Sequence, residues 1–246
     1  MENKIFERML NLENNHWWFV ARRKIIFSAI NNLNLSRKIK ILEAGCGNGC
    51  NLSMLSHFGE VVAFEKNEGA FKRARSKKIG QIFKAELPCN LPKDVKKNFD
   101  LIVLLDVLEH IKDDTQSLVT IRTLMSDKAL ILITVPAYQW LWSEHDTLHH
   151  HVRRYSKKTL KEKLNVSGFR VKYISYFNTL LFPFALVERM KQRIFSSSNE
   201  ETLSMPNKSI NYLLEKIFSY EVNFINKMSF PFGLSLLAIA EKINHE

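Results

Sequence analysis

The chain has 246 residues, of which 46% are hydrophobic and 25% are charged, and its formal net charge is +11. The length and composition fit one elaborated globular domain and exclude a disordered or fibrous chain, and no apolar run approaches the roughly 20 residues that span a bilayer. The three cysteines form neither a metal-binding spacing nor a disulfide framework, whereas the excess positive charge predicts an anionic partner: nucleic acid, a membrane surface or an acidic substrate.

Residues 2–35 are predicted to form helices that carry an aromatic cluster at His16–Phe19 and a basic run at Arg22–Lys24. Adjacent tryptophans cannot lie on one face of a helix, so one of Trp17 and Trp18 is expected to pack inward while the other covers another group. Two interpretations stay open from the residues: a helix fixed to the core, or a lid over a bound ligand.

The stretch Ile41–Gly49 reads ILEAGCGNG, an apolar run with the acid Glu43 followed by three glycines at alternate positions from Gly45. Glycine permits positive φ and lets the backbone approach a ligand closely. The helix predicted over Cys50–His57 begins with free N–H groups that face the turn. The pattern therefore predicts a strand, a tight turn and a helix that bind a nucleotide-like ligand.

The spacing of these glycines differs from the dinucleotide fingerprint G-x-G-x-x-G/A, because Cys50 occupies its sixth position. Glu43 also places a carboxylate beside the turn, where it suits a cation better than a pyrophosphate. The stretch resembles the first motif of the class I S-adenosylmethionine-dependent methyltransferases, acid-x-G-x-G-x-G, and the chain is similar to their bacterial type 11/12-like subfamily. The resemblance implies S-adenosylmethionine as the cofactor, with the acid and the turn holding its amino-acid end.

A second strand is predicted at Glu60–Phe64 and ends at Glu65. An acid at this position can accept hydrogen bonds from a ribose diol, and the resemblance gives Glu65 that role for adenosine. A helix over Asn67–Lys78 and a short strand at Gly80–Phe83 follow. The next segment is where the family contacts adenine, but this chain has Ala85–Glu86 where the family usually has an Asp or Ser after a glycine.

The run Phe99–Asp106 is nearly all apolar, as expected for a central parallel strand that is buried on both faces. The segment after it, Asp106–His110, resembles the family's fourth motif, which lies under the methyl-transfer centre. Ligands bind at the carboxyl ends of such strands. A helix at Asp113–Met125 and a fifth strand at Ala129–Val135 are predicted next.

The segment Pro136–Tyr155 is rich in aromatic residues and has little periodicity, and a long segment of this kind is usually functional. We expect it to select the methyl acceptor, although a solvated loop is the competing interpretation. Its four histidines suggest a metal, but three in a row cannot easily reach one ion and no carboxylate set completes a shell; no metal site is therefore expected. His145 with Asp146 is an acid–base candidate, and Arg153–Arg154 is a candidate anion contact.

Ser156 is a plausible N-cap for a helix at Lys157–Asn165, and strands are predicted at Phe169–Phe177 and Gly233–Ala240. Strands that alternate with helices predict a Rossmann-like, doubly wound α/β sheet. The resemblance implies that it has seven strands, with the last one antiparallel between strands five and six. The helical insert at residues 178–230 could fill the core, form a dimer face or lie on a membrane.

We expect one domain over residues 1–246. It divides into a helical lid at 1–38, a core at 39–177, the insert at 178–230, and a last strand with a tail at 231–246. The lack of a disulfide framework favours a reduced, cytoplasmic compartment, with peripheral contact at the inner face of the membrane as an option for the insert. Nucleic acid is not expected as a partner, because the basic residues are scattered.

Together these features predict a methyltransferase that acts on a small-molecule acceptor or on one linked to a lipid or saccharide. The alternatives are an NAD-dependent oxidoreductase of the same fold and a basic nucleic-acid-binding protein. Methyl transfer requires in-line alignment above all, and it requires a base only for a hydroxyl or a protonated amine. The candidate bases are His110 and His145.

The expected ligand contacts form two sets. The cofactor-binding set is Glu43, Ala44, Gly45, Cys46, Gly47, Gly49, Glu65, Lys66, Glu86, Leu87, Asp106 and Val107. The substrate-binding set is Trp17, Trp18, Arg22, Tyr138, Trp142, Arg153 and Tyr155.

Overall fold

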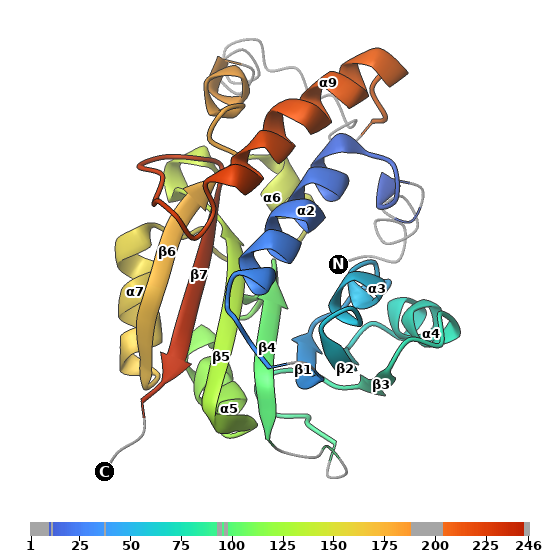
Figure 1. Ribbon diagram of the computed structural model, residues 1–246, viewed down its shortest axis with the longest axis vertical. Helices are drawn as coiled ribbons and strands as arrows, with labels where there is room; N and C mark the ends of the chain where they lie inside the picture. The colour runs from blue at the N-terminus through green and yellow to red at the C-terminus, as the bar shows by residue number, and fades with distance from the viewer. Residues whose placement is uncertain are drawn as a thin grey trace.

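The structure is a computed structural model that describes residues 10, 12–36, 38–92, 95, 98–187 and 204–243. Within these residues its centre is a sheet of β1 (Ile39–Ala44), β2 (Gly59–Glu65), β3 (Gln81–Lys84), β4 (Phe99–Leu105), β5 (Met125–Pro136), β6 (Phe169–Phe177) and β7 (Ser235–Lys242). The strand order is β3-β2-β1-β4-β5-β7-β6 (Figure 1). The strands β1 to β5 pair in parallel, and β7 is antiparallel to both β5 and β6. The predicted doubly wound sheet is confirmed, including the place of its last strand.

The helices and short turns connect these strands. They are α2 (Trp17–Asn31), α3 (Leu52–Leu55), α4 (Glu68–Ser76), η1 (Leu108–His110), α5 (Asp114–Arg122), η2 (Gln139–Leu141), α6 (Glu144–Leu148), α7 (Lys157–Val166), α9 (Lys208–Ser219) and η3 (Tyr220–Asn223). Parts of the predicted N-terminal helices, at 1–9, and of the predicted insert, at 188–203, lie outside the described residues. No helix in the described ranges is both long and apolar enough to cross a membrane.

The sheet separates two hydrophobic cores. Successive side chains of β4 alternate between them, because strand side chains have a period of two: Ile102 and Leu104 belong to one core, and Leu101 and Val103 belong to the other. The helices α5 and α7 cover the first face, and α2, α3 and α9 cover the second (Figure 1). Burial on both faces explains why β4 reads as a continuous apolar run.

Some element boundaries differ from the predictions. The predicted last strand begins at Gly233, but β7 begins at Ser235, where its ladders with Pro136 and Phe177 start. Strand β5 begins at Met125 instead of Ala129, because Met125 already pairs with Phe99 across an irregularity in the ladder.

Helix α9 lies along α2 on the outer side of the sheet (Figure 1). The Lys24 ammonium is 2.6 Å from the Glu215 carboxylate, and the Trp17 ring lies 6.0 Å from that of Phe218, which is fully buried. Core filling is therefore one role of the described part of the insert.

Candidate active site

The turn after β1 is shaped by glycine. Gly45, Gly47 and Gly49 have φ values of 85°, 54° and 76°, which side chains other than glycine rarely adopt. A Cβ at Gly45 would lie 2.7 Å from a methyl carbon of Val107, so the turn presses against the loop after β4. The Gly45 N–H donates to the Phe64 carbonyl at 2.9 Å. The predicted turn thus lies where β1, β2 and β4 end.

Glu43 is a fully buried carboxyl group beside this turn. One of its oxygens accepts a hydrogen bond from the Asn51 amide at 2.9 Å. Among the described residues the other oxygen has no hydrogen-bond partner. Burial raises the pKa of Glu43 from 4.5 to about 7. Such a group is poised to become ionised when a cation comes to lie beside it.

Glu65 ends β2 and faces the same turn, as predicted. One carboxylate oxygen accepts from the Gly47 N–H at 2.8 Å, and the other accepts from the Asn67 N–H at 2.7 Å. Each oxygen can accept a further hydrogen bond. The neighbouring Lys66 forms an exposed ion pair with Glu86 at 3.1 Å, so the predicted adenine-side segment is tied to the end of β2.

Asp106 follows β4 with a positive φ of 59°. Its carboxylate binds the Arg22 guanidinium at 2.7 Å and accepts a hydrogen bond from the Thr134 hydroxyl at 2.9 Å. Arg22 also donates to Thr134 at 2.8 Å, and its guanidinium carbon lies 5.3 Å from the Trp18 ring centre. The first turns of α2 therefore reach the carboxyl ends of β4 and β5, where a lid was expected.

A chain of aromatic rings follows the end of β5, and we call it the aromatic wall. Tyr138 stacks on Tyr176 with ring centres 4.9 Å apart, and it lies 5.4 Å from Trp140 and 6.0 Å from Phe182. Phe182 in turn lies 5.5 Å from Phe232. Trp140 and Phe232 are 53% and 42% exposed, so the wall offers apolar surface to solvent.

A model of the methyltransferase domain matches residues 18–174. The chain belongs to the methyltransferase family. This assignment decides between S-adenosylmethionine and NAD, and S-adenosylmethionine is the cofactor. A search of the curated proteins found no match.

Solved structures share the fold of this methyltransferase. One is the Haloferax volcanii complex between the Trm112 methyltransferase activator and a methyltransferase, with a TM-score of 0.65, 14% identity, and coverage of 99% of this chain and 96% of that one. A TehB-like S-adenosylmethionine-dependent methyltransferase from Corynebacterium glutamicum has a TM-score of 0.57 and 17% identity, covering 96% and 95%. An S-adenosylmethionine-dependent methyltransferase from Archaeoglobus fulgidus has a TM-score of 0.57 and 17% identity, and the match covers 96% of this chain and 99% of that one.

The residues around the glycine turn fit the methionine end of the cofactor. That end carries a cationic ammonium group, and the unpartnered, buried oxygen of Glu43 is the acceptor that such a group requires. Side chains at Gly45 and Gly49 would strike Val107 and Leu52, so the close packing of the turn requires glycine at both positions. Glu65 retains acceptor capacity for a ribose diol.

His145 and Asp146 do not form the predicted acid–base pair in the methyltransferase. Asp146 is fully buried and accepts hydrogen bonds from His151 at 2.8 Å and from Arg154 at 2.7 Å. His145 instead lies over His149, with ring centres 4.1 Å apart. Adjacent residues of α6 point in different directions, and the loop that follows brings His151 back onto Asp146.

Arg153 and Tyr155 share a partner within the protein. Asp114, 1% exposed, binds the Arg153 guanidinium at 2.5 Å, the Tyr155 hydroxyl at 2.9 Å and the Lys163 ammonium at 2.7 Å. Tyr155 is itself only 2% exposed. In the structure Arg153 is paired with Asp114 and Arg154 with Asp146, so the predicted anion contact stays a prediction.

The other predicted substrate residues all contact groups of the protein. Trp17 contacts α9, Trp18 lies under Arg22, and Tyr138 belongs to the aromatic wall. The Trp142 indole donates to the Thr147 hydroxyl at 3.3 Å, within the loop. Arg22 is 5% exposed, and its guanidinium forms an ion pair with Asp106 within the protein.

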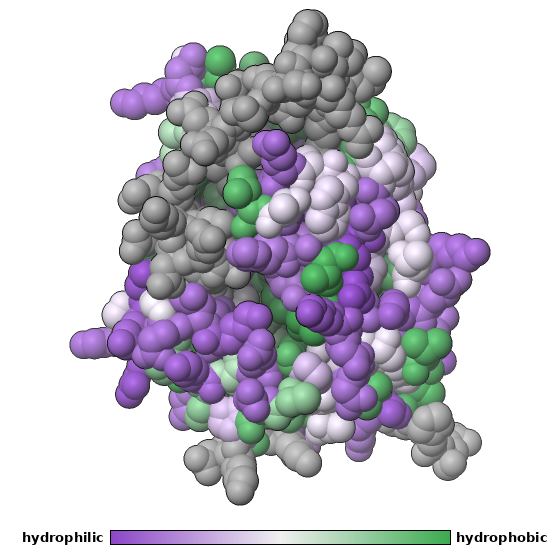
Figure 2. All heavy atoms as spheres, turned by 180° about the vertical axis from the view of Figure 1, so that it is seen from behind, coloured by the Kyte–Doolittle hydropathy of each residue, from purple (hydrophilic) through white to green (hydrophobic). Residues whose placement is uncertain are grey.

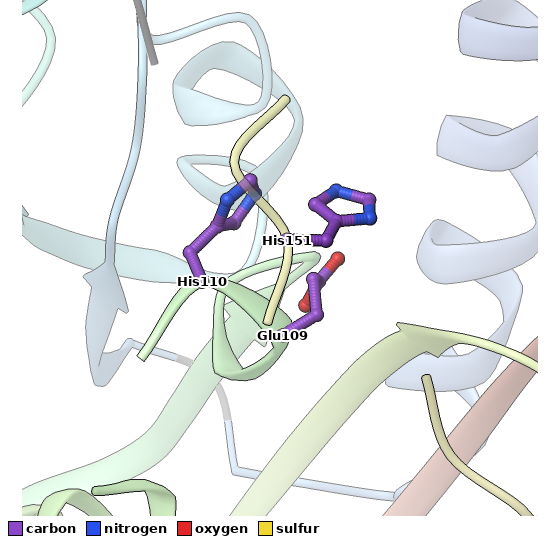
Figure 3. Close-up of side chains that lie close together, drawn as sticks. All are labelled: Glu109, His110 and His151. Atoms are coloured by element: carbon purple, nitrogen blue, oxygen red, sulfur yellow. The ribbon is translucent and has the colours of Figure 1, made fainter. Parts of the chain in front are cut away.

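His110 and Glu109 lie beside His151 (Figure 3). Burial lowers the pKa of His110 to about 3, and it lowers that of His145 equally, so both imidazoles are neutral and weakly basic at pH 7. Glu109 is fully buried, and neither of its oxygens has a hydrogen-bond partner among the described residues. Burial, assisted by the nearby Asp106, raises the pKa of Glu109 well above 4.5.

Three functional candidates were missed from the sequence. Glu109 lies in η1, within the segment that follows the buried strand β4, and this position could have indicated it. Thr134 is a hydroxyl within the apolar β5, and it bridges Arg22 and Asp106. Glu13 is 4% exposed and accepts a hydrogen bond from Asn48 of the glycine turn at 3.1 Å, a contact that no sequence pattern indicates.

Proposed function

We propose that this methyltransferase modifies an amphiphilic acceptor: a small molecule, or one linked to a lipid or a saccharide, whose apolar part contacts the aromatic wall. The observation that carries the proposal is the exposure of Trp140 and Phe232 at the end of a continuous chain of aromatic rings. Exposed aromatic rings at the rim of a site supply apolar contact area at low entropic cost. A fully polar acceptor would gain nothing from them.

The chain's own residues have simple tasks in this reaction. When bound, S-adenosylmethionine supplies a methyl group made electrophilic by its sulfonium. Glu43 and the glycine turn hold the methionine end, and Glu65 accepts hydrogen bonds from the ribose. Alignment of the acceptor by the first turns of α2 and by the aromatic wall provides proximity catalysis. His110 is a weak base because burial lowers its pKa to about 3.

The acceptor class is tested with alkylphenols and alkyl glycosides of short and long chain, by measuring S-adenosylhomocysteine release. We expect turnover that rises with alkyl length. Trp140→Ala and Phe232→Ala should each raise KM for the long-chain acceptors roughly tenfold and leave kcat unchanged, because they remove binding that is equal in the ground and transition states.

The matched control is Val166→Ala, which alters a 72%-exposed side chain on α7, far from the aromatic wall. Calorimetric titration with S-adenosylhomocysteine verifies that every variant retains its cofactor site, and Gly47→Arg should abolish that binding. Turnover that is independent of alkyl length, or equal KM values in Trp140→Ala and Val166→Ala, would contradict an apolar acceptor.

A further inference from the structure

We propose that Glu109, His110 and His151 bind a divalent transition-metal ion, with Zn²⁺ as the type case. Each residue offers one ligand atom, and the three atoms lie within 4.8 Å of one another. They converge from two segments, η1 after β4 and the loop after α6 (Figure 3). Sequence reasoning set a metal aside because the histidine run lacked a carboxylate, and the fold supplies that carboxylate from a distant segment.

Glu109 is the first independent indication of a ligand. Its side chain is fully buried, and both oxygens lack a hydrogen-bond partner within the described part of the chain. Buried carboxylates are normally paired with a cation or coordinate a metal, since an isolated charge in the interior is costly. The carboxylate points toward the His151 ring (Figure 3). A cation between them would satisfy it.

His151 is oriented as metal-binding histidines are. Its Nδ1 donates to Asp146 at 2.8 Å, which leaves Nε2 as the atom available for coordination. Metal ligands of this kind typically donate their other ring N–H to a carboxylate, which fixes the tautomer and the ring plane. Asp146 is in turn held by Arg154 at 2.7 Å, so the ring has a rigid support.

The two segments are also fixed to each other. The Val152 N–H, next to His151, donates to the Glu109 carbonyl at 2.7 Å, and the rings of His110 and His151 are 4.6 Å apart. Ligand atoms on one Zn²⁺ ion lie about 3.4 Å apart when each is about 2.1 Å from the metal. Small side-chain rotations would therefore close the site without moving the backbone.

Two imidazoles and one carboxylate select the class of ion. This donor set suits Zn²⁺ and other first-row transition ions, whereas Mg²⁺ and Ca²⁺ prefer all-oxygen shells. Three protein ligands leave a fourth position open, as in catalytic zinc sites. An acceptor hydroxyl bound there would lose its proton more readily; this catalytic role rests on the proposed function, but metal binding itself does not.

Metal binding is tested on the full chain, stripped with a chelator and titrated calorimetrically with Zn²⁺ in the absence of cofactor. We expect one ion per chain, confirmed by elemental analysis, and visible absorption bands when Co²⁺ replaces Zn²⁺. Glu109→Gln and His151→Asn should each weaken binding at least about 100-fold, because each removes one of three ligands.

The matched controls are His150→Asn, which alters the exposed neighbour in the histidine run, and His57→Asn, which alters an exposed histidine on another segment. Both should bind Zn²⁺ like the unaltered chain. Thermal unfolding separates folding from binding: Zn²⁺ should raise Tm for the unaltered chain and the two controls, but not for His151→Asn. If Glu109→Gln does not fold, Zn²⁺ binding by His151→Asn and the Co²⁺ spectrum of the unaltered chain decide whether the site binds a metal.

No stoichiometric binding, or equal binding by Glu109→Gln and the unaltered chain, would overturn the proposal; the latter would mean that surface histidines alone hold the ion. Separate titration with S-adenosylhomocysteine shows whether the cofactor site is intact. Failure of metal binding is thus distinguishable from failure of methyl transfer.

Discussion

Carboxylates around the site differ in their partners. Asp106 and Asp146 are each bound by an arginine guanidinium, at 2.7 Å in both cases. The Asp146–Arg154 pair is buried, so removing one partner would leave an uncompensated buried charge. Glu43 and Glu109 each have at least one oxygen without a partner in the described structure. These oxygens therefore have acceptor capacity that the described protein groups do not fill.

Cofactor affinity should depend on the ionisation of Glu43. Burial raises the pKa of Glu43 in the folded protein from 4.5 to about 7. Without cofactor, the protonated form therefore contributes to the free energy of unfolding in full below pH 4.5, and this contribution is lost as the pH rises to 7. A cationic ligand favours the ionised form. Affinity for S-adenosylhomocysteine, measured calorimetrically, should therefore rise about tenfold between pH 6 and pH 8 and then level off.

Glu43→Gln should bind more weakly and lose this pH dependence, whereas Glu162→Gln, which alters an exposed residue of α7, should retain it. A flat pH profile for the unaltered chain would show that Glu43 does not face the cationic end of the cofactor.

At this scale the sequence predicts residues whose roles are local. Glu43 and Glu65 were identified because both lie at fixed places in a strand–turn pattern. The partner of Arg153 and Tyr155 could not be foreseen, because Asp114 lies on a helix that the fold alone brings close. His145 was preferred to His151 for a similar reason, since adjacency in sequence is not contact in a loop.

At the scale of elements, the alternation of strands and helices could be predicted from the sequence, whereas the packing partner of the insert could not. Its apolar period predicted a helix but left open what the helix covers, and the structure places α9 on α2. Asn211 accepts the Trp17 N–H at 2.9 Å, a bond between residues far apart in the chain. Such pairings depend on topology, for which a hydrophobic period carries no information.

Glu221 of η3 should be a main anchor of the segment after β6. It is fully buried and accepts hydrogen bonds from the backbone N–H groups of Asn178, Thr179 and Leu180 at 2.7, 2.7 and 2.9 Å. Glu221→Ala leaves three donors unpaired, those of Asn178 and Thr179 buried, so we expect a loss of about 2–4 kcal/mol in the free energy of unfolding, measured in urea.

Glu162→Ala is the control for this substitution and should change the free energy of unfolding by less than about 0.5 kcal/mol, since its side chain is exposed. An equally small change for Glu221→Ala would mean that water replaces the carboxylate at these three N–H groups.

At the scale of the molecule, net charge and exposed apolar side chains combine. The chain carries a charge of +11. Phe184 and Val187 are 72% and 53% exposed, and Leu213 of α9 is 57% exposed; these two segments lie at the upper end of Figure 1. On the described part of the face seen from behind, hydrophobic patches are small and separated by hydrophilic side chains (Figure 2). We predict contact with an anionic membrane surface through the end formed by these two segments.

Vesicle sedimentation tests this contact. We expect the chain to bind phosphatidylglycerol-containing vesicles and not phosphatidylcholine vesicles, and to lose binding as salt rises, because anionic lipid and basic side chains attract within a Debye length. Phe184→Ser and Leu213→Ser together should weaken binding roughly tenfold by removing apolar area. Val166→Ser removes a similarly exposed side chain from the other side of the sheet, on α7. Equal losses for Val166→Ser and the double variant would assign the binding to charge alone, and the apolar end would then have no part in it.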